Sequence, residues 1–351
     1  MSAAEGQGLA GLEPELVEEW LAANVPGLVA PVRFVLVAGG RSNLTYRVTD
    51  ASGQHFALRR PPLGGVLSTA HDMGREWRFI SAMAPTAVPV APPLAFCDDE
   101  SVTGAGFYVM GFVDGRVLAD RAAAEELAPA ARMRAGEHVV EVLAALHALD
   151  PDDVGLGATA SQEGYVQRQL RRWNRQVHAS LAADDPDLGQ LEEIHDVLAA
   201  HIPEQTRGVV HGDFRPGNMA FGPDGTVRAV FDWELSTLGD PMADLSYLVA
   251  AWHEPGDEVA EGVEPGPTSV PGFPSRDELV AHYTRLTGRD VTGLPYWIAF
   301  NRWRSACILA GVRARYLAGV MADDGYLAEA QQSRPRLAEA AAQALKAAGL
   351  G

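Results

Sequence analysis

Cysteine is nearly absent from this chain of 351 residues, which contains only Cys97 and Cys307, far apart in the sequence. Without a CxxC pair or a Cys/His cluster, a disulfide framework or a zinc site is poorly supported, and we expect two reduced, buried thiols. No stretch approaches the ~18 consecutive apolar residues of a membrane-spanning helix. The N-terminal residues lack a basic start followed by an apolar run, so we expect no secretory signal and a cytoplasmic protein.

Basic residues are also scarce, with 28 Lys and Arg against 46 Asp and Glu and a formal net charge of −18. A nucleic-acid partner is therefore not expected, because phosphate backbones require a basic face. An acidic surface can attract a cationic substrate, but solubility alone is the favoured explanation, so charge leaves the substrate open. The balance of 47% hydrophobic and 21% charged residues is that of a folded protein, and the length suits two lobes or two small domains.

Residues 1–113 predict a small antiparallel sheet with one inserted helix. Runs rich in β-branched and aromatic residues, bounded by Gly, Pro and Asp, indicate the strands. The expected strands are Val32–Ala38, Thr45–Thr49, Gln54–Arg60, Pro93–Cys97 and Gly106–Val113. Ser68 can cap a helix that runs to about Ala84, with Met73, Trp77 and Ile80 on one face.

Residues 114–351 predict a larger, mostly helical lobe. Apolar residues recur at helical spacing through long stretches, and a short β-like insertion interrupts them at Gly208–His211 and Val227–Asp232. The segment Glu254–Pro274 is dense in Gly, Pro and Glu, which favours a flexible surface loop. The sequence therefore predicts an α+β protein with an N-terminal sheet lobe and a helical C-terminal lobe, and a cleft between two such lobes commonly holds a ligand.

The strongest motif is HGDFRPGN at residues 211–218, followed by FDWE at residues 231–234. Asp213 and Asn218 stand in a D-x-x-x-x-N arrangement typical of the catalytic loop of protein kinases. Phosphoryl transfer needs one carboxylate that orients the attacking hydroxyl, and an amide oxygen and a second carboxylate that hold magnesium. We predict the first role for Asp213 and the metal-binding roles for Asn218 and Asp232.

Each of these residues alone could be an ordinary turn-former, because Asp and Asn favour loops through local hydrogen bonds. The matched spacing and the Asp at the end of a predicted strand favour the catalytic interpretation. For His211 we expect a structural role, in which its ring nitrogens fix the loop.

A glycine-containing turn between the first two strands is a candidate phosphate-binding segment. It comprises Gly39, Gly40, Ser42 and Asn43 with Arg41 among them. Glycines allow backbone N–H groups to approach phosphate oxygens closely. A Gly-Gly turn is common between strands, so only its position upstream of the other motifs supports this role.

Arg59 and Glu76 form a candidate cation–carboxylate pair, one on the third strand and one on the inserted helix. Kinase-like sites pair a strand cation with a helix glutamate so that the cation points at the nucleotide phosphates. The cation is arginine here where most kinases have lysine, and arginine differs in reach and geometry. The alternative is that both residues are ordinary exposed charges.

With these motifs in order, the sequence resembles the aminoglycoside phosphotransferase and choline-kinase-like superfamily from about Val32 to about Val320. The resemblance implies a two-lobed protein-kinase-like fold, ATP and Mg²⁺ as cofactors, and a small hydroxyl-bearing acceptor. It also implies that adenine binds the backbone of Met110, Gly111, Phe112 and Val113. The stretch GDPMADL at residues 239–245 looks like a family signature in which Asp244 supports the catalytic loop.

A narrower likeness lies in LRRPP (58–62), HDMGREWR (71–78) and WELSTLGDP (233–241). These segments are similar to a kinase-like domain fused to certain eukaryotic acyl-CoA dehydrogenases, a branch that has Arg at the position of Arg59. The likeness implies a hydroxylated acyl acceptor, with a hydroxyacyl-CoA as one option. An antibiotic-modifying kinase and a non-catalytic nucleotide-binding pseudokinase stay open as alternatives.

Several arginines follow in the last predicted helix, about Tyr296–Val320. They are Arg302, Arg304, Arg313 and Arg315. The resemblance implies that C-terminal helices line the acceptor pocket, where an arginine fork suits an acyl carboxylate or a CoA phosphate. The alternative for each arginine is a pairing with surface carboxylates. An aminoglycoside site would instead present clusters of Asp and Glu. The sequence leaves the acceptor, the choice between ATP and GTP and the oligomeric state undetermined.

Overall fold

The computed structural model describes residues 9, 11–38, 43–62, 72–159, 164–257, 264–317 and 338–350. The chain divides into two compact units. The first comprises Met1–Gly115 and Arg228–Ser236, and the second comprises Arg116–Val227 and Thr237–Gly351. The short segment Arg228–Ser236 belongs to the first unit, although it follows most of the second in the sequence. The boundary predicted after residue 113 stays a prediction.

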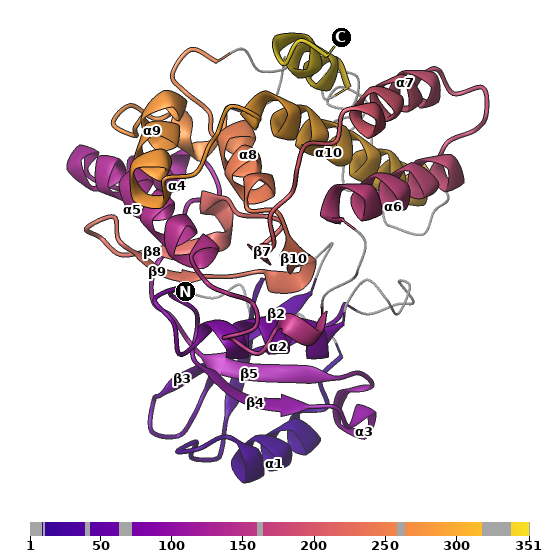
Figure 1. The fold of residues 1–351 in the computed structure, drawn as a ribbon. Coiled ribbons are helices and arrows are strands. Elements are labelled where there is room, and N and C mark those ends of the chain that lie inside the picture. Colours follow the sequence, from indigo (N-terminus) through magenta and orange to yellow (C-terminus); the bar gives the residue numbers. More distant parts are fainter. Residues whose placement is uncertain are drawn as a thin grey trace. The chain divides into compact units, whose positions relative to one another are not determined.

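A five-stranded antiparallel sheet forms the centre of the first unit, in the order β1-β2-β3-β5-β4 (Figure 1). The strands are β1 (Arg33–Ala38), β2 (Leu44–Thr49), β3 (His55–Arg60), β4 (Pro93–Cys97) and β5 (Phe107–Gly111). Each predicted strand overlaps one of these five. The β2–β3 turn forms as expected, because Asp50 Oδ1 accepts the backbone N–H groups of Ser52 and Gln54 at 2.9 and 2.8 Å.

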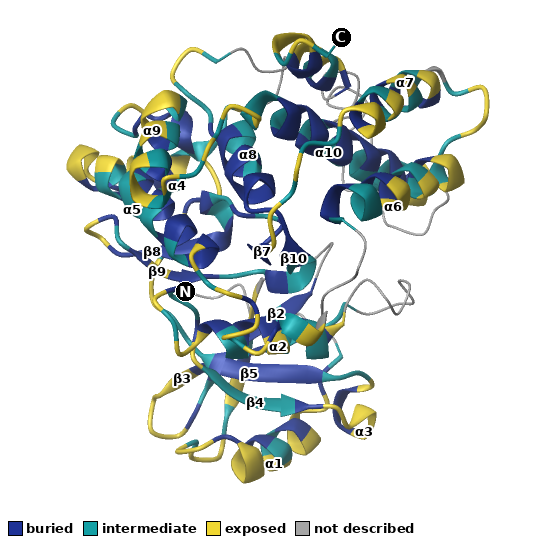
Figure 2. Ribbon diagram, viewed as in Figure 1, coloured by how far each residue is buried: buried dark blue, intermediate teal, exposed yellow. Residues whose placement is uncertain are grey.

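The core of the first unit follows from the alternation of residues along its strands. In β2, buried and half-buried residues alternate, and Tyr46 and Val48 are fully buried. Helix α1 (Pro14–Asn24) buries Val17 and Leu21 in the same apolar cluster. The blue interior and yellow margins of this sheet are visible in Figure 2. The short helix α3 (Glu100–Thr103) follows β4.

The inserted helix α2 (Met73–Met83) carries a buried glutamate on its inner face. Its buried residues are Met73, Glu76, Phe79, Ile80 and Met83. The predicted cap Ser68 lies outside the described residues, and the described helix is capped by Asp72, whose side chain accepts the N–H of Arg75. Trp77, which we expected on the buried face, is only half-buried.

The second unit is mostly helical. Its helices are α4 (Arg121–Glu125), α5 (Pro129–His147), α6 (Tyr165–Ser180), α7 (Pro186–Ala200), α8 (Met242–Ala251), α9 (Arg276–Thr287) and α10 (Leu294–Leu317). A further helix spans 338–347. Short strands interrupt the helices: β6 (Arg116–Val117) pairs with β8 (Met219–Phe221), and β7 (Gly208–Val210) pairs with β10 (Thr237–Gly239), both antiparallel. The chain passes from the second unit to the first within β9 (Val227–Val230).

Helix α10 lies at the centre of the second unit and packs against α6, α7 and α8. Its aromatic side chains are fully buried, and Trp303 Nε1 donates to the carbonyl oxygen of Leu191 in α7 at 2.9 Å. Asn301 Nδ2 donates to the carbonyl oxygen of Ala243 in α8 at 2.8 Å. Tyr165, the first residue of α6, stacks on Trp297. These contacts fix the face of α10 that approaches the loop before β8.

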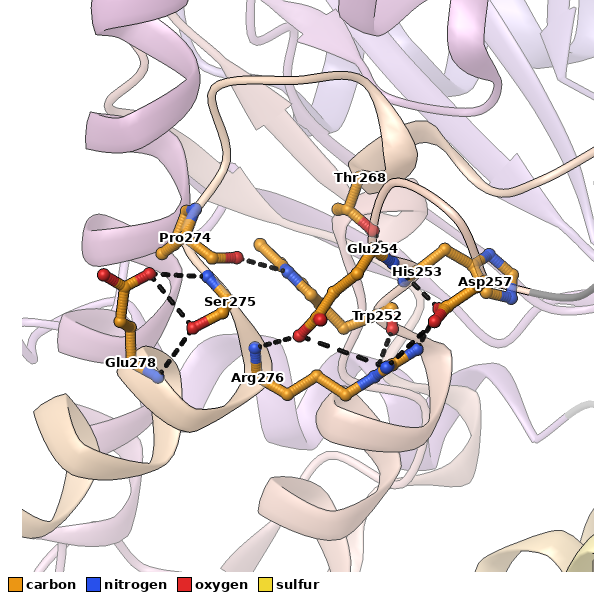
Figure 3. Close-up of polar contacts among 9 residues, drawn as sticks. All are labelled: Trp252, His253, Glu254, Asp257, Thr268, Pro274, Ser275, Arg276 and Glu278. Carbon is orange, nitrogen blue, oxygen red and sulfur yellow. Dashed lines mark hydrogen bonds and ion pairs between the residues drawn. The ribbon is translucent and has the colours of Figure 1, made fainter.

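The segment predicted as a flexible loop is held at both of its described ends (Figure 3). Arg276 forms a two-point ion pair with Asp257, and its backbone N–H donates to Glu254 Oε1 at 2.6 Å. His253 N–H donates to Thr268 Oγ1 at 2.8 Å. Residues 258–263 lie outside the described residues.

Both cysteines are buried thiols, as the sequence predicts. Burial raises the pKa of the Cys97 and Cys307 thiols. Of the helices in the described ranges, none combines the length and the apolar character needed to cross a membrane.

Candidate active site

Arg59 and Glu76 are paired in the first unit. Arg59 on β3 has its Nε 3.1 Å from Glu76 Oε1 on α2, and the Glu76 side chain is almost fully buried. Arg59 pairs in register with Tyr108 of β5, so both side chains lie on the face of the sheet that meets α2. The interpretation of both residues as exposed charges is therefore wrong.

The electrostatics of this pair explain why a charge can be buried there. Burial raises the pKa of Glu76, and the positive charge of Arg59 opposes that rise. Burial alone would lower the pKa of Arg59, but the charge of Glu76, assisted by Asp232 and Glu234, raises it above its ordinary value. The opposite charge of each group thus favours the charged form of the other, which offsets part of the cost of burial.

Asp232 is held next to Arg59 by an unusual backbone conformation. Its φ of 64° is the only positive value at a non-glycine position in the part of the chain that the structure describes. The Asp232 Oδ1 atom lies 2.5 Å from Arg59 Nη2. A residue in this conformation costs about 1–3 kcal/mol, and such residues gather at functional sites. The strain therefore supports the predicted functional role of Asp232.

The predicted phosphate-binding turn is only partly described. Gly39, Gly40 and Ser42 lie outside the described residues. Asn43 is 2% exposed, and its Nδ2 lies 3.3 Å from Glu76 Oε2 and 3.4 Å from Glu234 Oε2. Asn43 thus joins the carboxylates around Arg59, a contact that the sequence did not indicate.

The predicted adenine-binding backbone lies at the end of β5. The N–H of Gly111 donates to the carbonyl oxygen of Pro92 at 2.8 Å, and that of Phe112 to the carbonyl oxygen of His55 at 3.4 Å. Met110 is buried within the strand. An adenine contact at residues 110–113 would therefore use the carbonyl groups or the N–H of Val113. The role of these residues stays a prediction.

In the second unit, Asp213 and Asn218 meet within one loop. Pro216–Asn218 forms a single 3-10 turn, and this turn points Asn218 back at Asp213. Asn218 Nδ2 donates to Asp213 Oδ2 at 2.6 Å and to the Asp213 carbonyl oxygen at 2.9 Å. The Asp213 side chain is 18% exposed. A partly open carboxylate held by an amide is suited to orient a hydroxyl group.

The loop is supported from below by Asp244 at the start of α8. Asp244 Oδ2 accepts the N–H of His211 at 2.6 Å, and Oδ1 accepts the N–H of Gly212 at 2.8 Å. Gly212 has a φ of 89°, which favours glycine at this turn. The N–H of Asp213 donates to His211 Nδ1 at 3.2 Å. This geometry agrees with the supporting roles expected for His211 and Asp244.

A buried histidine continues this network. His147 Nδ1 lies 2.8 Å from the hydroxyl of Tyr283, and its Nε2 lies 3.6 Å from Asp244 Oδ2. Burial lowers the pKa of His147. Burial also disfavours the charged form of Asp244, but its hydrogen bonds keep the pKa of this carboxyl below the ordinary value. Asp244 is therefore a fixed anion beneath the loop.

Two residues near Asp213 were not identified as neighbours of the loop from the sequence. Tyr247 on α8 is near the Asp213 carboxylate, and burial together with the charge of Asp213 raises the pKa of its phenol. Arg304 on α10 has Nη2 2.8 Å from the carbonyl oxygen of Gly212. The sequence offered a weak signal for Tyr247, which lies three residues after Asp244 on the same helix face.

Asn218 in the second unit and Asp232 in the first each present an oxygen of the kind that binds magnesium. Asn218 turns its Nδ2 to Asp213, which leaves its Oδ1 without a hydrogen-bond donor among the described residues. Asp232 Oδ2 likewise accepts nothing within the described ranges, since Arg59 contacts Oδ1. Carboxylate and amide oxygens are the ligands that Mg²⁺ prefers, and it usually binds few of them together with substrate phosphates. In the described part of the chain there is no cluster of three or more His, Cys, Asp and Glu ligands, the pattern of a metal cage made by protein alone.

Comparisons with known proteins place the sequence among phosphotransferases. The sequence profile of the phosphotransferase enzyme family (APH) matches residues 33–279. The chain is 36% identical over 289 residues to acyl-CoA dehydrogenase family member 11 of Gallus gallus. That match covers 80% of this chain but 36% of the chicken protein, so the chain spans little more than a third of this relative.

Solved structures show the same fold. A Ralstonia eutropha protein with an aminoglycoside phosphotransferase designation is 34% identical, with a TM-score of 0.77 over 95% of this chain and 98% of that one. Choline kinase from Cryptosporidium parvum aligns with a TM-score of 0.68 at 12% identity, over 96% and 97% of the two chains. Amicoumacin kinase hAmiN in complex with AMP-PNP and Ca²⁺ aligns with a TM-score of 0.58 at 17% identity, over 94% and 93%. The predicted α+β kinase-like fold is confirmed.

Proposed function

The chain belongs to the phosphotransferase enzyme family, and on that premise we propose that it is a small-molecule kinase that uses ATP and Mg²⁺. The observation that carries this proposal is the 2.6 Å hydrogen bond between Asn218 Nδ2 and Asp213 Oδ2. Through this bond the side-chain amide of Asn218, a candidate metal ligand, holds Asp213, the candidate base. The two residues have the D-x-x-x-x-N spacing of kinase catalytic loops. We expect the protein to act in the cytoplasm, without a nucleic-acid or membrane partner.

The first unit supplies the groups for the nucleotide. Arg59 binds phosphate oxygens through its planar fork, and Glu76 orients that fork by holding Nε. The backbone of residues 110–113 binds adenine. Arginine in place of lysine keeps a permanent charge at this position, so the substitution is compatible with activity.

The second unit supplies the groups for the acceptor hydroxyl. Asp213 accepts a hydrogen bond from this hydroxyl and directs its oxygen at the γ-phosphorus of ATP. The new P–O bond forms as the bond to the β–γ bridging oxygen breaks, ADP leaves, and Asp213 receives the proton. Asn218 and Asp232 would hold Mg²⁺, which neutralises negative charge on the phosphates when bound.

For the acceptor we propose a hydroxylated acyl compound, such as a hydroxyacyl thioester of coenzyme A. The support is the similarity to a part of a relative named acyl-CoA dehydrogenase family member 11, a name that refers to acyl-CoA compounds. Likeness of fold does not transfer a substrate, so the acceptor requires its own test.

The test is phosphoryl transfer from radiolabelled ATP to a panel of hydroxyacyl-CoA thioesters, hydroxy acids and aminoglycosides. Asp213→Ala should reduce transfer by ~100- to 10,000-fold, because a positioned base contributes about that much. Its binding of MgATP, measured by thermal shift, should stay near that of the wild type. Asp153→Ala, at an exposed position of the same unit, is the matched control.

Transfer by Asp213→Ala at the wild-type rate would show that the assigned base is wrong. Transfer to aminoglycosides alone would favour an antibiotic kinase. Binding of nucleotide without transfer to any alcohol would favour a non-catalytic module.

A further inference from the structure

Of the four arginines on α10, the structure buries one against the catalytic loop. Arg302 Nη1 donates to the carbonyl oxygen of Ala340 at 3.1 Å, and Arg313 lies 3.7 Å from the Asp185 carboxylate. Arg315 is exposed. Arg304 is only 5% exposed and is therefore the cation whose environment needs an explanation.

Arg304 has polar and aromatic neighbours but no counter-ion. Its Nη2 donates to the carbonyl oxygen of Gly212, and its guanidinium lies 5.2 Å from the centre of the Tyr247 ring. Its Nε makes no hydrogen bond, and no carboxylate in the described ranges comes within ion-pair distance. Tyr165 is also close to Arg304. Burial raises the pKa of the Tyr165 phenol, and the positive charge of Arg304 opposes this rise.

A buried cation without an anion is an unfavourable arrangement in a folded protein. Buried charges are normally paired, because the interior replaces the lost hydration only when counter-charges and hydrogen bonds are supplied. A carbonyl oxygen and an aromatic face compensate in part. Arg172 on α6 is a second positive charge close to Arg304, and partial burial together with the charge of Arg304 lowers its pKa. An oxyanion at the Arg304 guanidinium would supply the missing counter-charge and reduce the repulsion between the two arginines.

The location relates this anion site to the acceptor. Gly212 directly precedes Asp213, and Arg304 contacts its carbonyl oxygen. The Arg304 guanidinium lies over the Tyr247 ring, and burial together with the charge of Asp213 raises the pKa of the Tyr247 phenol, so Tyr247 is close to both groups. A group bound by Arg304 is thus one tyrosine side chain away from the base. An acceptor that places its hydroxyl at Asp213 can therefore place a second oxygen, a few bonds from that hydroxyl, at Arg304.

We propose that Arg304 binds an acyl oxygen of the acceptor and selects hydroxylated acyl compounds over neutral alcohols. This inference rests on the proposed kinase function and adds the residue that recognises the acceptor. A free carboxylate and a thioester carbonyl present the same kind of oxygen, and the guanidinium fork suits both, the carboxylate more strongly.

The experiment compares hydroxy carboxylates of increasing chain length, their coenzyme A thioesters and the diols of matching length. Each diol keeps the reacting hydroxyl and lacks the acyl oxygen. Arg304→Gln should lower kcat/KM for the acyl acceptors by roughly 30- to 5,000-fold, the range for loss of one partner of a buried charge pair. It should leave the diol rate nearly unchanged. Arg304→Lys should recover part of the loss, because it restores the charge without the fork.

Arg302→Gln is the matched control, because it removes a partly buried arginine of the same helix that bonds to a backbone carbonyl. An equal loss for diols and acyl acceptors in Arg304→Gln would overturn the proposal and assign Arg304 to support of the loop. The form that the wild type phosphorylates with the higher kcat/KM identifies the natural acceptor.

A binding measurement on the wild type keeps the inference testable if Arg304→Gln does not fold. Calorimetric titration with the hydroxy carboxylate and the diol should show at least ~30-fold tighter binding of the acyl compound. Equal binding contradicts the role of Arg304. A protein that phosphorylates diols as well as acyl acceptors remains a kinase, whereas a protein that transfers phosphate to neither contradicts the proposed function itself.

Discussion

Arg59 Nη2 lies 2.5 Å from Asp232 Oδ1. The candidate phosphate-binding cation therefore neutralises the candidate metal ligand, while its Nε holds Glu76. The forked guanidinium makes both contacts at once, which the single nitrogen of a lysine does less well. Asp232 Oδ2, which Arg59 does not contact, would be the oxygen available to a metal ion.

We expect Arg59→Gln to weaken ATP binding by roughly 10- to 150-fold, the loss of a hydrogen bond to a charged group. Calorimetric titration with MgATP measures this change. Arg78→Gln, at an exposed position on the same helix as Glu76, should bind as the wild type does. If Arg59→Gln binds MgATP with wild-type affinity, Arg59 is not part of the nucleotide site.

Two glycines with nearly the same φ should respond differently to substitution. A Cβ atom added at Gly53 (φ 87°) would meet open space, whereas one added at Gly225 (φ 86°) would clash with the carbonyl oxygen of Ala131 in α5. Gly53→Ala should lower the free energy of unfolding by about 1–2 kcal/mol through backbone strain alone. Gly225→Ala should lower it by about 2–5 kcal/mol, because overpacking adds to the strain. Denaturant unfolding measures both, and equal losses would show that α5 does not pack against this turn as described.

His147 predicts a pH dependence of stability. Its folded-state pKa is lowered by burial, so its contribution to stability is present above the ordinary value of 6.5 and is lost as the pH falls below it. His147→Gln keeps an amide for the Tyr283 hydroxyl but cannot titrate. Between pH 6.5 and about 5, the free energy of unfolding of the wild type should fall more steeply than that of the variant. The difference in slope is at most about 1.4 kcal/mol per pH unit, and parallel curves would show that His147 does not change its charge on unfolding.

Much of the fold follows from local patterns in the sequence. The strands of the first unit form where runs of β-branched residues lie between turn residues. The Asp50 turn and the alternating burial in β2 each depend on only a few neighbouring residues, so the sequence reveals them. Asp213 and Asn218 meet because their spacing closes one short turn. The family resemblance, which rested on the same motifs, is confirmed.

The contacts that the sequence did not indicate are produced by tertiary packing. Tyr247 and Arg304 reach the loop because α8 and α10 pack against each other, and no spacing in the sequence encodes that contact. Glu76 lies on an apolar helix face because Arg59 on a neighbouring strand compensates its charge. The sequence predicted this pair from the order of the kinase-like motifs, because the apolar pattern of the helix alone does not reveal a partner distant in the sequence.

The most direct test of the kinase function is a thermal-shift titration of the wild type and Asp232→Ala with ATP, with and without magnesium. Asp98→Ala, an exposed aspartate of the same unit, is the control. We expect ATP to raise the melting temperature of the wild type and the control much more with magnesium than without it. In Asp232→Ala the effect of magnesium should be lost. No shift of the wild type at millimolar MgATP, or an undiminished effect of magnesium in Asp232→Ala, would contradict the central claim.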